Sequence, residues 1–214
     1  KDALSANTTA SNNTAVGYQA GYSNTTGDRH VALGYSALKD NTTGYRNNAI
    51  GYLALTTNTT GFQNNALGVN ALRYNTTGTN NVAIGHEAGL SVTTGIENTL
   101  IGASAGDALT DADKNVAVGT NALTSDTLGS NSVAIGRAAL ANQNFTSATD
   151  SFNTAVGARA GVEVTTGIQN TLIGGQAGDA LTDADFNVAV GTDALTADTL
   201  GSRSVAIGRR SLYT

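Results

Sequence analysis

Residues 13–17 read Asn-Thr-Ala-Val-Gly, and this phrase decides the fold because it recurs through almost the whole chain. Its general form is Asn-x-Ala, then an aliphatic residue, then Gly. Repetition at a short fixed period predicts a repeat architecture, because each unit can bury apolar surface only against its neighbours. Twelve copies are spaced by 17 residues, apart from one step of 21, and their glycines are Gly17, Gly34, Gly51, Gly68, Gly85, Gly102, Gly119, Gly136, Gly157, Gly174, Gly191 and Gly208.

Each position of the repeat holds a narrow choice of residues. An aliphatic residue precedes the Gly in all twelve copies, Ala precedes that residue in ten, and the fourth residue before the Gly is Asn in nine. The third residue after the Gly is Ala in eleven copies, Leu or Gly follows it, and a turn such as Thr-Thr-Gly at residues 25–27 comes next. Leu100 and Leu172 replace the Ala that stands two residues before the Gly. His30, Ser132 and Ser204 replace the Asn that stands four residues before it.

This pattern predicts an all-β chain, a parallel β-solenoid of about 12 coils with a 17-residue period. Two short apolar stretches and two Gly-marked corners suit one coil. Because side chains alternate along a strand, we expect the aliphatic residue to face the lumen and the Ala before it to face outward. We expect the Asn column to stack from coil to coil as an amide ladder.

The break in the period divides one continuous solenoid into parts. Residues 1–12 form an N-terminal lead-in, 13–140 form coils 1–8, and 153–214 form coils 9–12. The irregular step falls in residues 141–152, which we expect to protrude as an inserted surface loop. Residues 89–140 and 161–212 align without gaps and are identical at 41 of 52 positions, which indicates an internal duplication.

Composition excludes several classes of protein. The 214 residues carry a net charge of −5, only 13% are charged, and Pro, Cys, Met and Trp are absent. Without Cys there is no disulfide, thiolate metal site or cysteine nucleophile. An acidic chain without a basic block is a poor nucleic-acid binder, and no apolar run reaches the ~20 residues that span a bilayer. The lack of Met predicts a piece of a longer protein.

Two versions of the repeat resemble known fibre proteins. Asn-Ser-Val-Ala-Ile-Gly at residues 131–136 resembles the head repeat of YadA-like trimeric autotransporter adhesins. Asn-Thr-Ala-Val-Gly-Tyr-Gln-Ala-Gly followed by Asn-Thr-Thr-Gly, within residues 13–27, resembles repeats of phage tail fibres. The resemblance covers residues 13–212, although the 17-residue period is longer than that of the adhesin head, so larger corners are expected.

The resemblance implies properties that the residues alone do not give. It implies a left-handed parallel β-roll that assembles as a homotrimer, with the inner strands forming the trimer core. It also implies a structural and adhesive segment of a fibre that mediates attachment to a host or surface. The partner is then a cell-surface glycan or protein receptor, and the location is extracellular, on a virion tail fibre or a bacterial cell surface.

Aromatic residues are the candidate receptor-binding residues. Tyr18, Tyr35 and Tyr52 each follow the Gly of successive coils, so we expect them to stack as a stripe. Tyr45 and Phe62 form a second column directly after the turn Gly. Sugars often bind to aromatic faces, which favours a receptor surface here. The alternative is that the stacked rings only pack against one another.

An acidic phrase, Asp-x-Asp-x-Asn, occurs once in each half of the duplication. It resembles the opening of a calcium loop, in which oxygen ligands stand at alternate positions. The Gly and the distal Glu of such a loop are missing, so we expect a polar corner without metal and keep calcium as the alternative. The residues concerned are Asp111, Asp113, Asn115, Asp183, Asp185 and Asn187.

We expect no catalysis and no cofactor. The glycines follow the coil period and form no phosphate-binding loop, and His30 and His86 stand in different columns of the repeat. Two alternative functions remain open. Asp111 and Asp113 as paired carboxylates would suit a polysaccharide-degrading spike. The Thr-Thr-Gly turns, such as that at residues 42–44, would suit an ice-binding Thr array.

Overall fold

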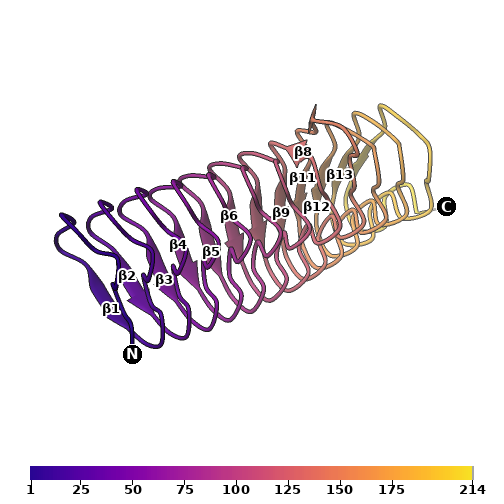
Figure 1. The fold of residues 1–214 in the computed structure, drawn as a ribbon. Helices are drawn as coiled ribbons and strands as arrows, with labels where there is room; N and C mark the ends of the chain where they lie inside the picture. Colours follow the sequence, from indigo (N-terminus) through magenta and orange to yellow (C-terminus); the bar gives the residue numbers. More distant parts are fainter. Residues whose placement is uncertain (214) are drawn as a thin grey trace.

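The chain is a parallel β-solenoid in the computed structural model, which describes residues 1–213. One short strand from each coil joins a single 12-stranded parallel sheet that runs the length of the rod (Figure 1). Eleven pairings connect these strands, which gives about eleven turns and confirms the predicted all-β solenoid. The strands of this sheet are β1 (Thr14–Val16), β2 (Val31–Leu33), β3 (Asn48–Ile50), β4 (Asn65–Leu67), β5 (Val82–Ile84), β6 (Thr99–Ile101), β7 (Val116–Val118), β9 (Val133–Ile135), β11 (Thr154–Val156), β12 (Thr171–Ile173), β13 (Val188–Val190) and β14 (Val205–Ile207).

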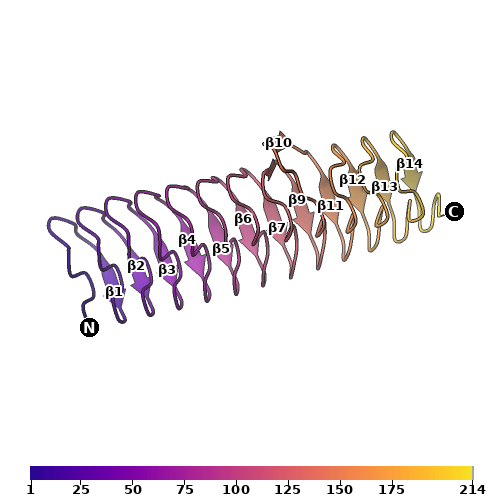
Figure 2. The same cartoon turned by 45° about the vertical axis from the view of Figure 1, so that its right-hand side comes forward.

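The register repeats the sequence period. Ala15 lies opposite Ala32, and Ala32 opposite Ala49, so strands pair at an offset of 17 residues, except at the irregular step, where Ala134 pairs with Ala155. The strands lie side by side along one side of the rod (Figure 2). Hydrogen bonding between coils continues outside the strands, for example from the Thr25 N–H to the Thr42 carbonyl oxygen at 3.0 Å. Adjacent coils are therefore joined around most of their circumference.

The strand side chains face the opposite way from our expectation. Ala32, at the centre of β2, is 1% exposed, whereas the aliphatic Leu33 beside it is 39% exposed. The same alternation holds in the other strands of this sheet, with a central residue that is buried, or half-buried in β1, and flanking residues that are half-buried or exposed. The prediction that the aliphatic residue lines the lumen is wrong, because the lumen opposite the strand has room only for a methyl group.

The residues across the lumen explain this lack of space. In six coils a fully buried Leu, such as Leu55 or Leu72, follows the second Ala and fills the interior. In β6 the strand itself carries Leu100 in place of Ala. At the position that holds Leu55 or Leu72 in other coils, this coil and the preceding one have Gly106 and Gly89. A methyl group added at either Gly would come within 2.7 Å of a Leu100 methyl carbon. A large side chain on one wall of the lumen thus requires a small one on the other.

The duplicated half repeats this compensation. Leu172 lies in β12, and methyl groups added at Gly161 and Gly178 would stand 2.6 and 2.7 Å from its methyl carbons. Interiors are packed at crystal-like density, so a Leu on the strand is compensated by Gly across the lumen in both halves.

Buried amides form two ladders along the interior, which confirms the expected Asn ladder and adds a second. In the column of the strand-preceding Asn, the Asn47 Oδ1 accepts the Asn64 N–H at 2.9 Å and its Nδ2 donates to the Gly61 carbonyl at 2.8 Å. The second ladder uses the Asn of the turn Asn-Thr-Thr-Gly: Asn58 Nδ2 donates to Asn41 Oδ1 at 2.7 Å. The ladders supply partners for most of these buried amide groups, while Asn75 Oδ1 and Asn187 Nδ2 are buried without a hydrogen bond to any described residue.

Left-handed backbone recurs at fixed positions in each coil. In the coil of β2 these positions are Arg29, Ser36 and Leu38, with φ of 58°, 51° and 53°. None of the non-glycine residues with positive φ in the described chain is Val, Ile or Thr, because β-branching makes this conformation costly. The Gly after each strand is more restricted: Gly17 has φ of 136°, and an added Cβ would lie 2.3 Å from the Gly34 carbonyl oxygen.

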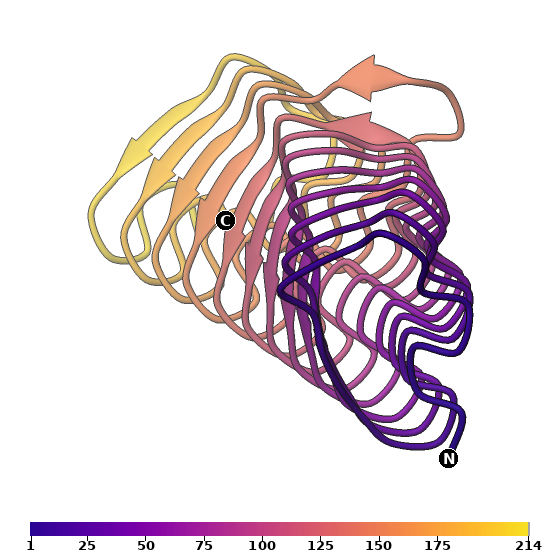
Figure 3. The same cartoon turned by 60° about the vertical axis from the view of Figure 1, so that its left-hand side comes forward.

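The inserted loop is shorter than expected from the sequence. Hydrogen bonds between coils continue up to Asn144, which donates to the Thr165 carbonyl, and resume at Thr149. Residues 145–148 lie between, and Thr149–Asp150 (β10) pairs with Gly129–Ser130 (β8) in a two-stranded sheet. This segment projects from the outline of the rod when the molecule is seen from its N-terminal end (Figure 3). The side chain of Phe145 folds back and is only 5% exposed.

The expected lead-in is stacked on the first coil. The backbone N–H groups of Leu4, Ala6 and Thr8 donate to carbonyl oxygens of Ala20, Tyr22 and Thr25, at 3.0, 3.0 and 3.1 Å. Residues 1–12 thus cover part of the first coil in the manner of a further turn.

His30 is the one described histidine within the Asn column. Its Nδ1 accepts the Asn47 N–H at 3.2 Å, and its Nε2 lies 3.3 Å from Asn41 Nδ2. Burial is the main cause of the lowered pKa of His30, which backbone hydrogen bonds and nearby Asp28 only partly oppose. A second ring proton would point directly at the Asn47 N–H.

We predict that His30→Asn makes the rod less sensitive to acid. The unfolded chain takes up a proton at the ordinary histidine pKa of about 6.5, whereas the folded chain resists it, so native stability falls as the pH drops below that value. An Asn would accept the Asn47 N–H without this penalty. Thermal melts between about pH 8 and 5.5 should show a smaller loss in the variant, and equal losses in both proteins would contradict the prediction.

We also predict that Leu100→Ala and Gly89→Leu compensate each other. The first change opens a cavity and should cost about 2–5 kcal/mol, and the second overpacks the lumen by about 1–3 kcal/mol. Together they recreate the arrangement at Leu72, so the double variant should be more stable than additivity predicts by at least ~1 kcal/mol. Urea denaturation measures the coupling. Leu100→Ala with Gly161→Leu, in the distant duplicate, is the control and should be additive.

Candidate interaction surfaces

The outer face of the 12-stranded sheet carries a continuous aliphatic column. It consists of the residue before the Gly in every coil, and seven of its twelve members are 38–69% exposed. Lone exposed apolar residues are ordinary, but a contiguous row marks an interaction site. We call this column the aliphatic stripe; its members are Val16, Leu33, Ile50, Leu67, Ile84, Ile101, Val118, Ile135, Val156, Ile173, Val190 and Ile207.

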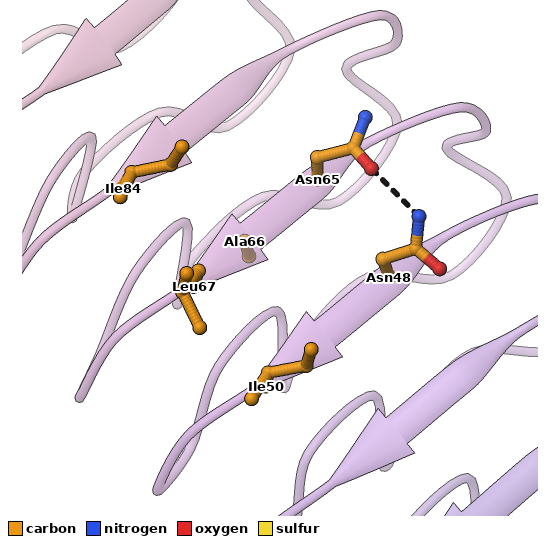
Figure 4. Close-up of a pocket in the computed structure, with 6 residues that line it drawn as sticks. All are labelled: Asn48, Ile50, Asn65, Ala66, Leu67 and Ile84. Atoms are coloured by element: carbon orange, nitrogen blue, oxygen red, sulfur yellow. Dashed lines mark hydrogen bonds between the residues drawn. The ribbon is translucent and has the colours of Figure 1, made fainter.

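A second outward column runs beside the aliphatic stripe. It is formed by the first residue of each strand and contains Val six times, Thr four times and Asn twice. Where the two Asn residues occur, the face is hollowed by a shallow pocket of about 270 Å³ (Figure 4). The lining residues are Asn48, Ile50, Asn65, Ala66, Leu67 and Ile84.

The expected aromatic stacks are confirmed. The ring centroids of Tyr18 and Tyr35 are 5.2 Å apart, and those of Tyr35 and Tyr52 are 5.3 Å apart. Tyr45 and Phe62 stack at 4.8 Å with nearly parallel rings. Because the rings lie face to face, the middle ring of the Tyr column offers mainly its edge to solvent. A sugar that needs an open ring face would find it only at the ends of a stack.

The two aromatic columns flank the sheet. Tyr45 stands three residues before β3, and Tyr52 stands two residues after it. The column of Tyr52 continues the exposed apolar surface of the aliphatic stripe beyond Gly51, with Tyr52 itself 50% exposed. On the other side, the Arg46 guanidinium carbon lies 5.7 Å from the centroid of the Tyr45 ring.

The side chains of each Asp-x-Asp-x-Asn motif do not converge on a single site. Asp111 is exposed and accepts a hydrogen bond from the Thr94 hydroxyl, whereas Asn115 is buried in the amide ladder. Asp113 is half-buried, and its Oδ1 accepts the Ile96 N–H at 2.8 Å. No group of three or more acidic or histidine side chains within residues 1–213 is placed to hold a metal ion.

The second copy repeats this arrangement at Asp185 and Asn187 but not at Asp183, which bonds to its own neighbour in the chain. Asp183 accepts a hydrogen bond from the Thr182 hydroxyl at 3.3 Å, and the Asp185 Oδ1 accepts the Ile168 N–H at 2.8 Å. Asn187 is buried and its N–H donates to Asn170 Oδ1. In both copies the middle Asp, Asp113 or Asp185, accepts a hydrogen bond from a backbone N–H of the preceding coil.

The duplicated halves differ at a neighbouring carboxylate. Asp107 Oδ1 accepts a hydrogen bond from the Thr124 hydroxyl at 2.6 Å. The equivalent Asp179 has a buried Oδ1 that no described residue contacts by a hydrogen bond. Burial therefore raises the pKa of Asp179, and a hydrogen bond from Gln176 only partly opposes this rise.

The two Thr residues of each Thr-Thr-Gly turn differ in exposure: the first is half-buried, and the second is exposed. The first Thr donates along the rod, as Thr42 does to the Thr59 carbonyl at 3.1 Å. The second, such as Thr43, is exposed. The outward Thr array is thus one residue wide, and in later coils Asp111 and Leu128 stand in its place.

The two histidines do not share a site. His30 is buried in the interior ladder, whereas the exposed His86 lies beside Glu87, with 3.7 Å between the imidazole Nδ1 and the carboxylate. No family model, curated protein or solved structure matches this chain. None of the described residues forms a helix that could cross a membrane.

Sequence reasoning did not identify the aliphatic stripe, because it assigned those residues to the lumen. One signal was available. Leu100 in the Ala column coincides with Gly89 and Gly106 at sites that otherwise hold Leu, which indicates that the Ala side of the strand is the packed side.

Proposed function

We propose that this chain is a structural and adhesive segment of a trimeric fibre that attaches to a host or surface. The aliphatic stripe carries this proposal. It runs along all twelve strands, and water-exposed Val, Ile and Leu in one unbroken row gain free energy when another apolar surface covers them. A second and a third copy of the chain provide such a surface along the full length of the rod.

The size of the face fits an interface between copies. Twelve strands at ~4.8 Å spacing give a length of roughly 58 Å, and the four residues from the start of a strand to its Gly give a width of roughly 13 Å. The product, ~750 Å², is the area that each copy would offer to its two neighbours together, and it is close to the ~800 Å² that one protein contributes to a standard interface. Closed rotational symmetry would leave no copy of the stripe exposed.

The resemblance to phage tail fibres and YadA-like adhesin heads belongs to this proposal, as does the left-handed sense of the β-roll. Such a rod acts as a long spacer without catalytic residues, cofactor or membrane insertion. Three copies of one binding surface would raise the avidity for a cell-surface glycan or protein receptor. The location would be extracellular, on a virion or a bacterial surface.

The oligomeric state tests the proposal. Light scattering during size exclusion should give a mass of about 64 kDa, three times the 21.5 kDa chain. Placing two charges on the stripe with Ile84→Asp and Ile135→Asp should release folded monomers, because buried unpaired carboxylates are costly. Thr43→Asp with Thr77→Asp, at exposed positions of the turn, is the matched control and should remain trimeric. A monomeric parent chain would refute the proposal.

Receptor binding through the aromatic columns is a separate prediction. Replacing Tyr18, Tyr35 and Tyr52 together with Ser, and Tyr45 and Phe62 together with Ser, separates the two surfaces. We expect at least one variant to lose about tenfold or more in binding to target cells, as aromatic hot spots do. Mass and melting temperature identify variants that fail to assemble. Unchanged binding of both variants would assign the rings to packing alone.

A further inference from the structure

Two asparagines interrupt the outward column that accompanies the aliphatic stripe. Asn48 in β3 and Asn65 in β4 are neighbours in the sheet, whereas the ten other strands place Val or Thr at this position. In contrast to the ladder Asn residues from Asn24 onward, which are buried, both lie on the outer face, beside the pocket formed with Ile50, Leu67 and Ile84.

The two amides leave hydrogen-bonding capacity unused. Asn48 Nδ2 donates to Asn65 Oδ1 at 2.7 Å. Within residues 1–213 no other hydrogen bond engages either side chain, so Asn48 Oδ1 and Asn65 Nδ2 remain available to a partner (Figure 4). The interior ladder shows how such amides can be satisfied, since Asn58 both donates to Asn41 and accepts from Asn75.

The remainder of the face specifies little about axial position. Its residues repeat every 17 positions, so sliding one copy along another by whole coils again places aliphatic residues against aliphatic residues. Each step of ~4.8 Å loses only the contacts of one terminal coil. A periodic interface therefore tolerates several alignments unless a feature distinguishes them.

The amide pair is such a feature. When copies are aligned, the free amide groups of neighbouring chains meet in the same layers and can bond to one another. A slip of two coils or more places every Asn48 and Asn65 amide against Val or Thr, and each unpaired buried group then costs about 1–3 kcal/mol. A single polar Asn fixes register and oligomer state in coiled coils by the same physics.

We propose that Asn48 and Asn65 set the axial register in which copies of this chain associate through the aliphatic stripe. The inference rests on the trimer proposed above. The partner surface is the same amide pair on the neighbouring copies, so the pair determines specificity more than strength. Replacing both amides by Val, the residue found at this position in the flanking strands β2 and β5, should leave the fold and the trimer intact.

Cysteine cross-linking tests the register, because the chain has no Cys of its own. Val82→Cys and Val116→Cys lie in the same outward column, two coils or ~9.6 Å apart. The two single-cysteine chains, distinguished by mass tags, are refolded together and oxidised. Aligned copies form disulfides only between like chains, since ~9.6 Å exceeds the reach of a disulfide. Slipped copies form disulfides between unlike chains.

We expect disulfides between like chains to dominate with native asparagines, and Asn48→Val with Asn65→Val to raise the unlike fraction at least about fivefold. Thr154→Val with Thr171→Val, in the same column of two adjacent strands, is the matched control and should leave the fraction unchanged. An equal unlike fraction with and without the asparagines would overturn the inference. A trimer that forms no cross-links would overturn it too, by placing this face away from the interface.

Mass separates this failure from failure of the proposed function. A trimeric parent chain whose register does not respond to the asparagines refutes the amide pair alone. A monomeric parent chain refutes the trimer, and the register proposal with it. Circular dichroism of the double Val variant verifies that its coils are folded before cross-linking is compared.

Discussion

The fixed cross-section of the lumen is the constraint on which the other features of this rod depend. Ala on the strand is combined with a buried Leu across the lumen in six coils, and Leu100 on the strand faces Gly89 and Gly106. Hydrogen bonds between coils hold the backbones at one spacing, so a larger side chain on one wall cannot be accommodated by moving the other. Interior volume is thereby conserved from coil to coil, and the 17-residue unit can repeat without accumulating strain.

The same constraint determines the exterior. Because the lumen accepts only a methyl group from most strands, the larger aliphatic side chains of those strands lie on the outer face. A surface that would be a core in a wider solenoid becomes a candidate interface between chains. Most interior amides already bond to backbone groups or to one another, whereas the Asn48–Asn65 pair on the outside retains a free donor and a free acceptor. Assembly and internal packing thus have a common origin.

The sequence predicts the period, the parallel all-β fold, the amide ladder and the aromatic stacks, because each follows from which residues recur in one column. It does not predict which strand face is inside. Alternation requires Ala32 and Leu33 to face opposite ways, but the residues across the lumen decide between the two. The calcium alternative rests on Asp111, Asp113 and Asn115 standing at alternate positions, which would share a face only in an extended segment. Lys114 has φ of 58°, so the backbone turns before Asn115 and directs its side chain inward.

Coil-on-coil stacking also gives this β-protein an unusually local topology. Strand partners are 17 residues apart in a chain of 214, a ratio of about 0.08 that lies in the range of fast-folding helical bundles. Closing the 21-residue turn at the insertion instead of a 17-residue turn adds only about 0.2 kcal/mol of loop entropy. Once a few coils have formed, each new turn adds to an existing edge, so growth can proceed outward in both directions. We therefore expect folding to proceed by addition of neighbouring coils, without the distant chain contacts that slow the folding of most β-sheet proteins.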